Sequence, residues 1–166
     1  MAANNPKLKI PFTTAARMAE VAGLLLLLSF WVYTLTYLPK LPDIIPTHFG
    51  AGGEVDGHGD KWTLVALPGI ATILYVLMTL VARYPHKMNY LVEITPQNAF
   101  KQYSIVTGMF RVMKIAIVIV FFMIGFQTVQ IAMGAPDFLG KWFMMILFAL
   151  IFSPVFYFLI QSSKNA

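Results

Sequence analysis

The chain has 166 residues, 58% of them hydrophobic and only 11% charged, which departs from soluble globular composition and is typical of a helical membrane protein. It contains no cysteine, so disulfides, thiolate metal sites and cysteine nucleophiles are excluded. The formal net charge is +5, but the basic residues lie at the edges of apolar runs. This pattern indicates membrane topology and lipid headgroup contact and gives no support for nucleic-acid binding.

Four apolar runs predict membrane-spanning helices over residues 16–38, 62–82, 112–133 and 141–161. Each is about 20 residues long, enough to cross the ~30 Å hydrocarbon layer. Helices are expected because a lone strand would leave backbone amides without partners in lipid. The first run is too long for a signal peptide and no cleavage site follows it, so we interpret it as a retained helix. The fold class is therefore all-α: an integral membrane four-helix bundle forming one domain over residues 1–166.

The segment between the first two helices, residues 39–61, has an unusual composition for a short connection. Pro39, Pro42 and Pro46 disfavour helix and hold the chain in extended or turn conformations. Gly50 and Gly53 then permit a tight reversal. Acidic and imidazole side chains alternate with glycines in the remainder of the segment. We expect a structured loop rather than a flexible one.

The polar residues of this loop allow three chemical interpretations. In the first, the His48 ring donates a hydrogen bond to Asp56 and locks the loop over the helix ends. Phe49 then anchors in the membrane, and Lys61 pairs with an acid or extends to the headgroups. In the second, a divalent ion such as zinc binds the loop, although the spacing matches no established zinc motif. The candidate ligands would be His48, Asp56, His58 and Asp60.

The third interpretation is acid–base catalysis with His48 as the base and Asp56 orienting it. No nucleophile accompanies the pair, so we assign no catalytic residue and expect no cofactor. The structural interpretation is preferred, and metal binding stays open.

Residues 83–111 are predicted to form a segment with a short amphipathic helix that starts at Thr95-Pro96. Lys101, Arg111 and Lys114 would meet anionic headgroups there. Near the other end of the third helix, Gln127 and Gln130 share one helical face. They would either bond to neighbouring helices or support the underside of the loop.

The distribution of lysine and arginine predicts the orientation. If both termini are cytoplasmic, the inner segments hold nine of these residues and the outer segments three. The nine are Lys7, Lys9, Arg17, Arg83, Lys87, Lys101, Arg111, Lys114 and Lys164, and the three are Lys40, Lys61 and Lys141. The positive-inside bias therefore predicts a multi-pass protein of the cell (inner) membrane with cytoplasmic N- and C-termini and an extracytoplasmic loop.

The run LPDIIPTHFGAGGEVDGHGDK resembles the N-terminal domain of the SdpI family of bacterial membrane proteins, domain-of-unknown-function family 1648. The motif positions are Leu41, Pro42, Pro46, His48, Phe49, Gly53, Asp56 and Lys61. The stretch NYLVEITPQNAFKQY is similar to the segment after that family's second helix. The resemblance implies the membrane fold of this domain and a functional role for the motif. The best-known member of that family looks like a protein that gives immunity to a secreted toxic peptide and signals by sequestering a repressor at the membrane.

Two functional hypotheses follow. The first is a non-enzymatic bacterial membrane protein of the SdpI-like class whose outer loop recognises a peptide or protein partner. It would act as an immunity or signalling factor or as a small subunit of a membrane complex. The second is a metal-dependent membrane enzyme or transporter that uses His48, Asp56 and His58. The lipid bilayer is a partner under both hypotheses, and a homo-oligomer is plausible.

Overall fold

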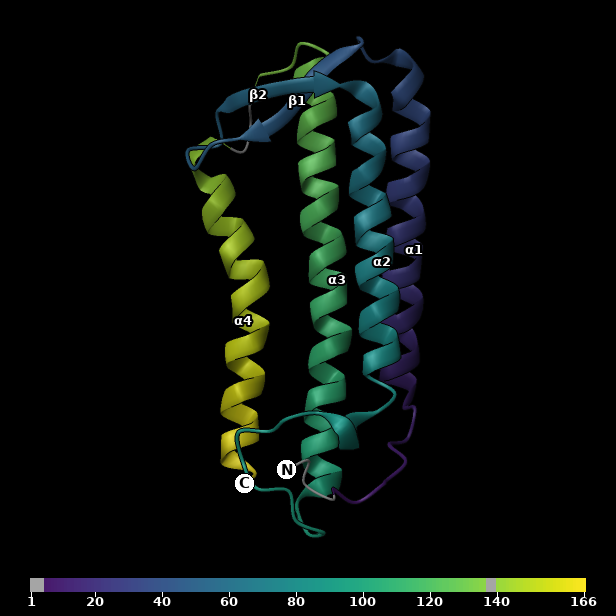
Figure 1. The fold of residues 1–166 in the computed structure, drawn as a ribbon, viewed down its shortest axis with the longest axis vertical. Coiled ribbons are helices and arrows are strands. Elements are labelled where there is room, and N and C mark those ends of the chain that lie inside the picture. The colour runs from purple at the N-terminus through teal and green to yellow at the C-terminus, as the bar shows by residue number, and fades with distance from the viewer. Residues whose placement is uncertain (1–4, 137–139) are drawn as a thin grey trace.

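The computed structural model describes residues 5–136 and 140–166, which form four long helices and one β-hairpin (Figure 1). The helices are α1 (Thr14–Tyr37), α2 (Ala66–Val81), α3 (Ala99–Ala132) and α4 (Phe143–Lys164). All four helices are long and apolar enough to cross a membrane, if α2 is taken together with the turn before it. The predicted all-α class of multi-pass membrane protein is confirmed, and the hairpin is a minor addition to it.

The third helix is longer than predicted. It begins at Ala99, so the expected short helix and the expected third membrane helix are one continuous element. Thr95 and Asn98 close its start, because each side chain accepts a hydrogen bond from the other's backbone N–H, at 2.9 and 3.2 Å. No proline interrupts residues 99–132. At about 1.5 Å per residue, 34 residues span about 51 Å, so α3 extends well beyond a ~30 Å hydrocarbon layer.

The second helix starts as a tight 3-10 turn, η2 (Lys61–Val65), and becomes α-helical at Ala66. The Asp60 carboxylate caps this turn by accepting the Trp62 N–H at 2.8 Å. Pro68 therefore falls in the first turn of α2, close to its junction with the 3-10 turn.

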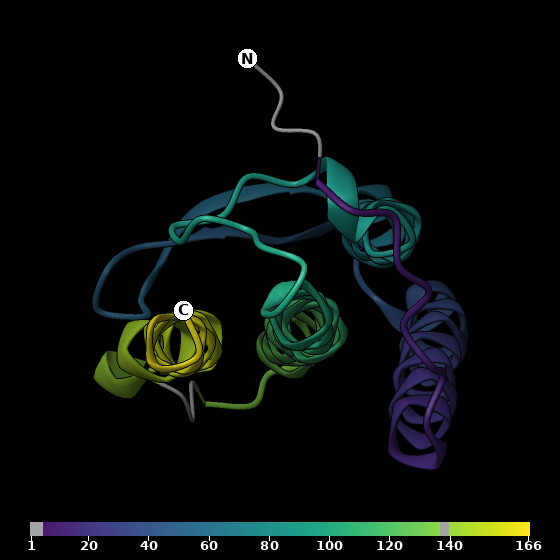
Figure 2. The same cartoon turned by 90° about the horizontal axis from the view of Figure 1, so that it is seen from below.

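The helices are arranged around α3. Figure 2, seen from the end that carries the C-terminus, shows α3 between α4 on one side and α1 and α2 on the other. The core of α1–α3 contains Phe30, fully buried and stacked on Phe122 with ring centroids 4.9 Å apart. α4 packs chiefly on α3, and only 6% of the most apolar 18-residue stretch of α4 is buried inside the structure. Most of the α4 surface is therefore available to lipid or to another protein.

The hairpin lies across the end of the helices opposite the C-terminus (Figure 1). It consists of β1 (Ile44–Phe49) and β2 (Val55–Asp60), paired antiparallel. A cluster of buried side chains joins it to the helices: Leu41, Ile45, Leu64 and Val129. We call this end of the molecule the hairpin end and the other the terminal end.

Candidate functional site

The side chains of β1 hold the hairpin down on the helices. Ile45 is fully buried, Leu41 is 4% exposed, and Pro46 is buried beside them. Their main partners are Leu64 at the start of the second helix and Val129 near the end of α3. Burying a side chain of this size contributes roughly 1.5–3 kcal/mol, so these contacts fix the hairpin as part of the core. The motif leucine and its second proline are therefore structural residues.

The predicted contact between His48 and Asp56 is present. The His48 Nδ1 atom lies within hydrogen-bonding distance of the Asp56 Oδ1 atom, on the exposed side of the hairpin. The pairing is irregular around this contact, with register shifts between Pro46 and His48 and between His48 and Phe49. Gly57 stands opposite His48, and a Cβ there would be only 2.9 Å from the His48 Cβ. The neighbouring glycine thus leaves room for the histidine side chain.

The tip of the hairpin contacts the start of α4. Residues 50–54 form the reversal, in which Gly50 N–H donates to the Glu54 carbonyl at 2.8 Å. Gly53 is buried with φ +88°, and a Cβ at this position would overlap the carbonyl oxygen of Gly140. Phe49 packs near Phe143 of α4, with ring centroids 6.2 Å apart. The hairpin therefore reaches from the ends of α1 and α2 to α4, the helix that otherwise packs chiefly on α3.

Lys61 closes the base of the hairpin. Its ammonium donates to the Asp43 carboxylate at 2.8 Å, and its backbone N–H donates to the Asp43 carbonyl at 2.9 Å. The predicted pairing of Lys61 with an acid is confirmed. The hydrogen bond from Lys61, followed by its positive charge, lowers the pKa of the Asp43 carboxyl below its usual range. Pro42 lies exposed in the turn just before this pair.

This pair makes a pH-dependent contribution to the hairpin base. Because the pKa of Asp43 is lower in the folded protein than in the unfolded chain, the contribution is fully present above the unfolded pKa. It is lost as pH falls through the lower folded pKa. We expect amide exchange at Lys61 N–H, corrected for intrinsic rates, to speed up modestly below about pH 4. An Asp43→Asn variant should lack this pH step, and an identical step in the variant would contradict the assignment.

The remaining candidate residues do not join one centre. His58 is exposed opposite Pro46 on the neighbouring strand, and Asp60 serves as the cap of η2. Across residues 5–136 and 140–166, no group of three His, Asp or Glu side chains is close enough to hold a metal ion. Gln127 is 2% exposed, and Gln130 is half-buried one turn further along α3. The two glutamines flank Val129, which packs under β1. Their own support of the hairpin stays a prediction.

A second polar centre, at the terminal end, was not predicted. Lys114 is 2% exposed, so the expectation that it meets lipid headgroups is wrong. Its ammonium donates to the Glu20 carboxylate at 2.5 Å and to the Thr79 hydroxyl at 2.8 Å, and lies over the Tyr75 ring. Arg111 also approaches Glu20, at 3.5 Å. The available signal was Glu20 itself, an acid near the start of an apolar helix that needs a partner.

Comparison with known proteins finds a family model that matches the part of the chain containing the hairpin. Residues 24–72 match the family model described as Domain of unknown function (DUF1648). This stretch is therefore similar to the DUF1648 domain. It begins within α1, contains the whole hairpin and ends within α2, and all eight motif residues fall inside it.

One similar protein extends the comparison. It is an "Uncharacterized protein" of Archaeoglobus fulgidus, 33% identical over 87 residues that make up 48% of each chain. The chain therefore spans about half the length of the curated relative it matches. No solved structure matches the present chain. The family description and the relative's name carry no activity, so a role for the hairpin has to be argued from its geometry.

Proposed function

We propose that this chain is a non-enzymatic membrane protein of the SdpI-like class whose hairpin recognises a peptide or protein partner. One observation carries the proposal: the motif residues fix the hairpin and leave a polar face exposed. Leu41 and Pro46 are buried, Gly53 packs against the Gly140 backbone just before α4, and Lys61 ties the base to Asp43. A role in immunity, in signalling or as a small subunit of a membrane complex would follow from the partner's identity.

A fixed hairpin suits recognition for two physical reasons. Little conformational entropy has to be lost on binding, because the hairpin is already ordered by its contacts with the helices. Among the residues that the structure describes, the sheet has two strands, so each offers one edge whose backbone groups are not paired with a third strand. An extended peptide segment can add to such an edge through main-chain hydrogen bonds. Side chains beside the edges, including Thr47, His48 and His58, are exposed and would supply specificity.

This proposal places the hairpin on the outer face of the cell membrane, with both termini in the cytoplasm. Its support is the count of nine basic residues on the inner side against three on the outer side. Recognition of this kind needs no cofactor and no catalytic residue. A bacterial setting rests on the SdpI-like resemblance alone.

Photo-crosslinking tests the proposal. A photoreactive residue at His58, on the exposed face of β2, should yield a discrete adduct with one protein or peptide in native membranes. A probe at Met133, exposed at the same end but just after α3, is the matched control and should not yield it. Because the hairpin face depends on the His48–Asp56 contact, adding Asp56→Ala should reduce the His58 adduct at least severalfold at equal membrane level.

Two results would contradict the proposal. One is an adduct pattern at His58 that matches the pattern at Met133. The other is a His58 adduct whose yield is unchanged when both His48→Ala and Asp56→Ala are present in a properly inserted protein.

A further inference from the structure

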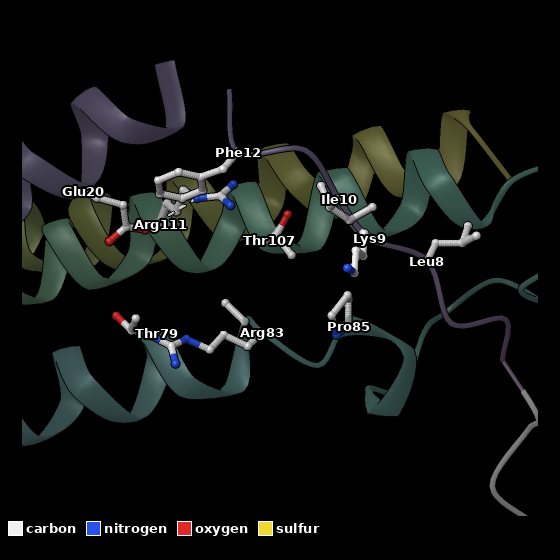
Figure 3. A pocket seen from close by; sticks show the side chains of 11 residues that line it. Leu8, Lys9, Ile10, Phe12, Glu20, Thr79, Arg83, Pro85, Thr107 and Arg111 are labelled. Atoms are coloured by element: carbon white, nitrogen blue, oxygen red, sulfur yellow. Dashed lines mark ion pairs between the residues drawn. The ribbon is translucent and has the colours of Figure 1, made fainter. Parts of the chain in front are cut away.

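The terminal end contains a cavity of about 620 Å³ that the proposed function does not use. It lies between the N-terminal segment, α1, the end of α2 and α3 (Figure 3). Three cationic side chains line it from three different parts of the chain: Lys9, Arg83 and Arg111. Glu20 is the acidic residue in the lining.

Positive charge exceeds negative charge at this cavity. Glu20 is shared by two cations, since it pairs with Arg111 at 3.5 Å and with the buried Lys114 at 2.5 Å. Within the part of the chain that the structure describes, these are the ion pairs formed at the cavity, and Lys9 and Arg83 add two further positive charges. Several cations around one volume, with one carboxylate already shared, favour an anionic ligand. Guanidinium groups in particular match phosphate geometry.

The depth of the cavity identifies the source of the phosphate. Lys114 lies 18 residues before Ala132, the last residue of α3, and Glu20 lies 17 residues before Tyr37, the last residue of α1. At about 1.5 Å per residue these stretches measure about 27 and 26 Å, close to one hydrocarbon thickness of ~30 Å. With the hairpin end at one boundary, the cavity therefore lies at the level of the opposite headgroups.

The remaining lining suits an amphipathic ligand. The N-terminal segment contributes Leu8, Ile10 and Phe12 beside Lys9, and Leu8 and Phe12 are 38% and 50% exposed. The Phe12 ring also lies under the Arg111 guanidinium, 5.5 Å from its centroid. Apolar side chains next to cations can contact the glycerol and upper acyl carbons while the cations face the phosphate.

From these observations we infer that the cavity binds the phosphate of an anionic phospholipid headgroup. Lys9, Arg83 and Arg111 contact the phosphate, and Glu20 acts as a positioning residue that holds Arg111 beside the cavity. Lys114 stays behind them as a structural partner of Glu20. This inference is independent of the hairpin and of the function proposed for it.

Lipid retention measured by native mass spectrometry tests the inference. Purified full-length protein would be titrated with phosphatidylglycerol, with phosphatidylcholine and with inorganic phosphate in the same detergent. The wild type should retain about one phosphatidylglycerol, and phosphatidylcholine and inorganic phosphate should compete at least about tenfold more weakly. Lys9→Gln combined with Arg83→Gln should weaken phosphatidylglycerol binding at least about tenfold, since each juxtamembrane cation contributes substantially to such binding.

The matched control is Lys101→Gln combined with Lys87→Gln, which removes the same charge at the same end from residues outside the cavity lining. It should change retention less than about twofold, and Arg83→Lys should recover part of the loss seen with Arg83→Gln. Equal losses in the two double variants would show general surface attraction and overturn the inference. Inorganic phosphate competing as well as phosphatidylglycerol would also overturn it, because the ligand would then be a soluble anion.

Discussion

Replacing Glu20 by glutamine should destabilise the folded protein more than any other single change considered for this chain, by about 3–5 kcal/mol. The reason is that Lys114 is 2% exposed and would be left among α1, α2 and α3 without a carboxylate partner. The Thr79 hydroxyl and the Tyr75 ring would remain, but neither carries the opposite charge. The measurement is thermal and denaturant unfolding of purified protein in one fixed detergent.

A double variant separates the pair from the helix packing. Glu20→Gln together with Lys114→Met removes both charges, so it should recover most of the loss caused by Glu20→Gln alone. Arg17→Gln, an exposed position on the same helix, is the control for general charge removal. The account of the ion pair fails if Glu20→Gln behaves like Arg17→Gln, or if the two changes at the pair simply add.

The second large effect is expected from Gly53→Ala at the tip of the hairpin. An L-residue at φ +88° costs about 1–2 kcal/mol, and the new methyl group would also overlap the Gly140 carbonyl. Together we expect a loss of about 2–4 kcal/mol, with the hairpin tip moving away from α4. Unfolding measurements give the first quantity, and the distance between spin labels at Ala51 and Trp142 gives the second.

Gly134 provides a matched control for this prediction. It has the same φ of +88°, but a Cβ there would meet no heavy atom within 4 Å. Gly134→Ala should therefore show the backbone cost alone and leave the label distance unchanged. Equal effects of the two substitutions would mean that the contact between the hairpin and α4 contributes nothing.

The long elements could be predicted from the sequence because hydropathy over about 20 residues depends on local composition alone. This gave the four helices and their membrane class. It could not show that α3 starts at Ala99, since residues 99–111 are less apolar and were separated from the rest on hydropathy. The two strands were also missed. Pro46 interrupts β1, although its other residues favour a strand, and the glycines and aspartates of β2 disfavour one.

Part of the candidate site could be predicted as well. The contacts His48–Asp56 and Lys61 with an acid followed from residue chemistry within one short loop. The contacts between residues far apart in the sequence could not be predicted in this way. Nothing near Gly53 in the sequence points to Gly140, and nothing near Lys114 points to Glu20, which is 94 residues away. Such contacts are set by how the helices pack, which a single sequence does not specify.

Hydrogen exchange of the backbone amides in residues 44–60 tests most directly whether the hairpin is a fixed, pre-shaped element docked on the helices. The account predicts that the ladder amides of β1 and β2 exchange at least about a hundredfold more slowly than unstructured peptide, an opening free energy of about 2.7 kcal/mol. Gly53→Ala should reduce this protection and Gly134→Ala should not. Exchange of these amides at the unstructured rate in the wild-type protein would contradict the account.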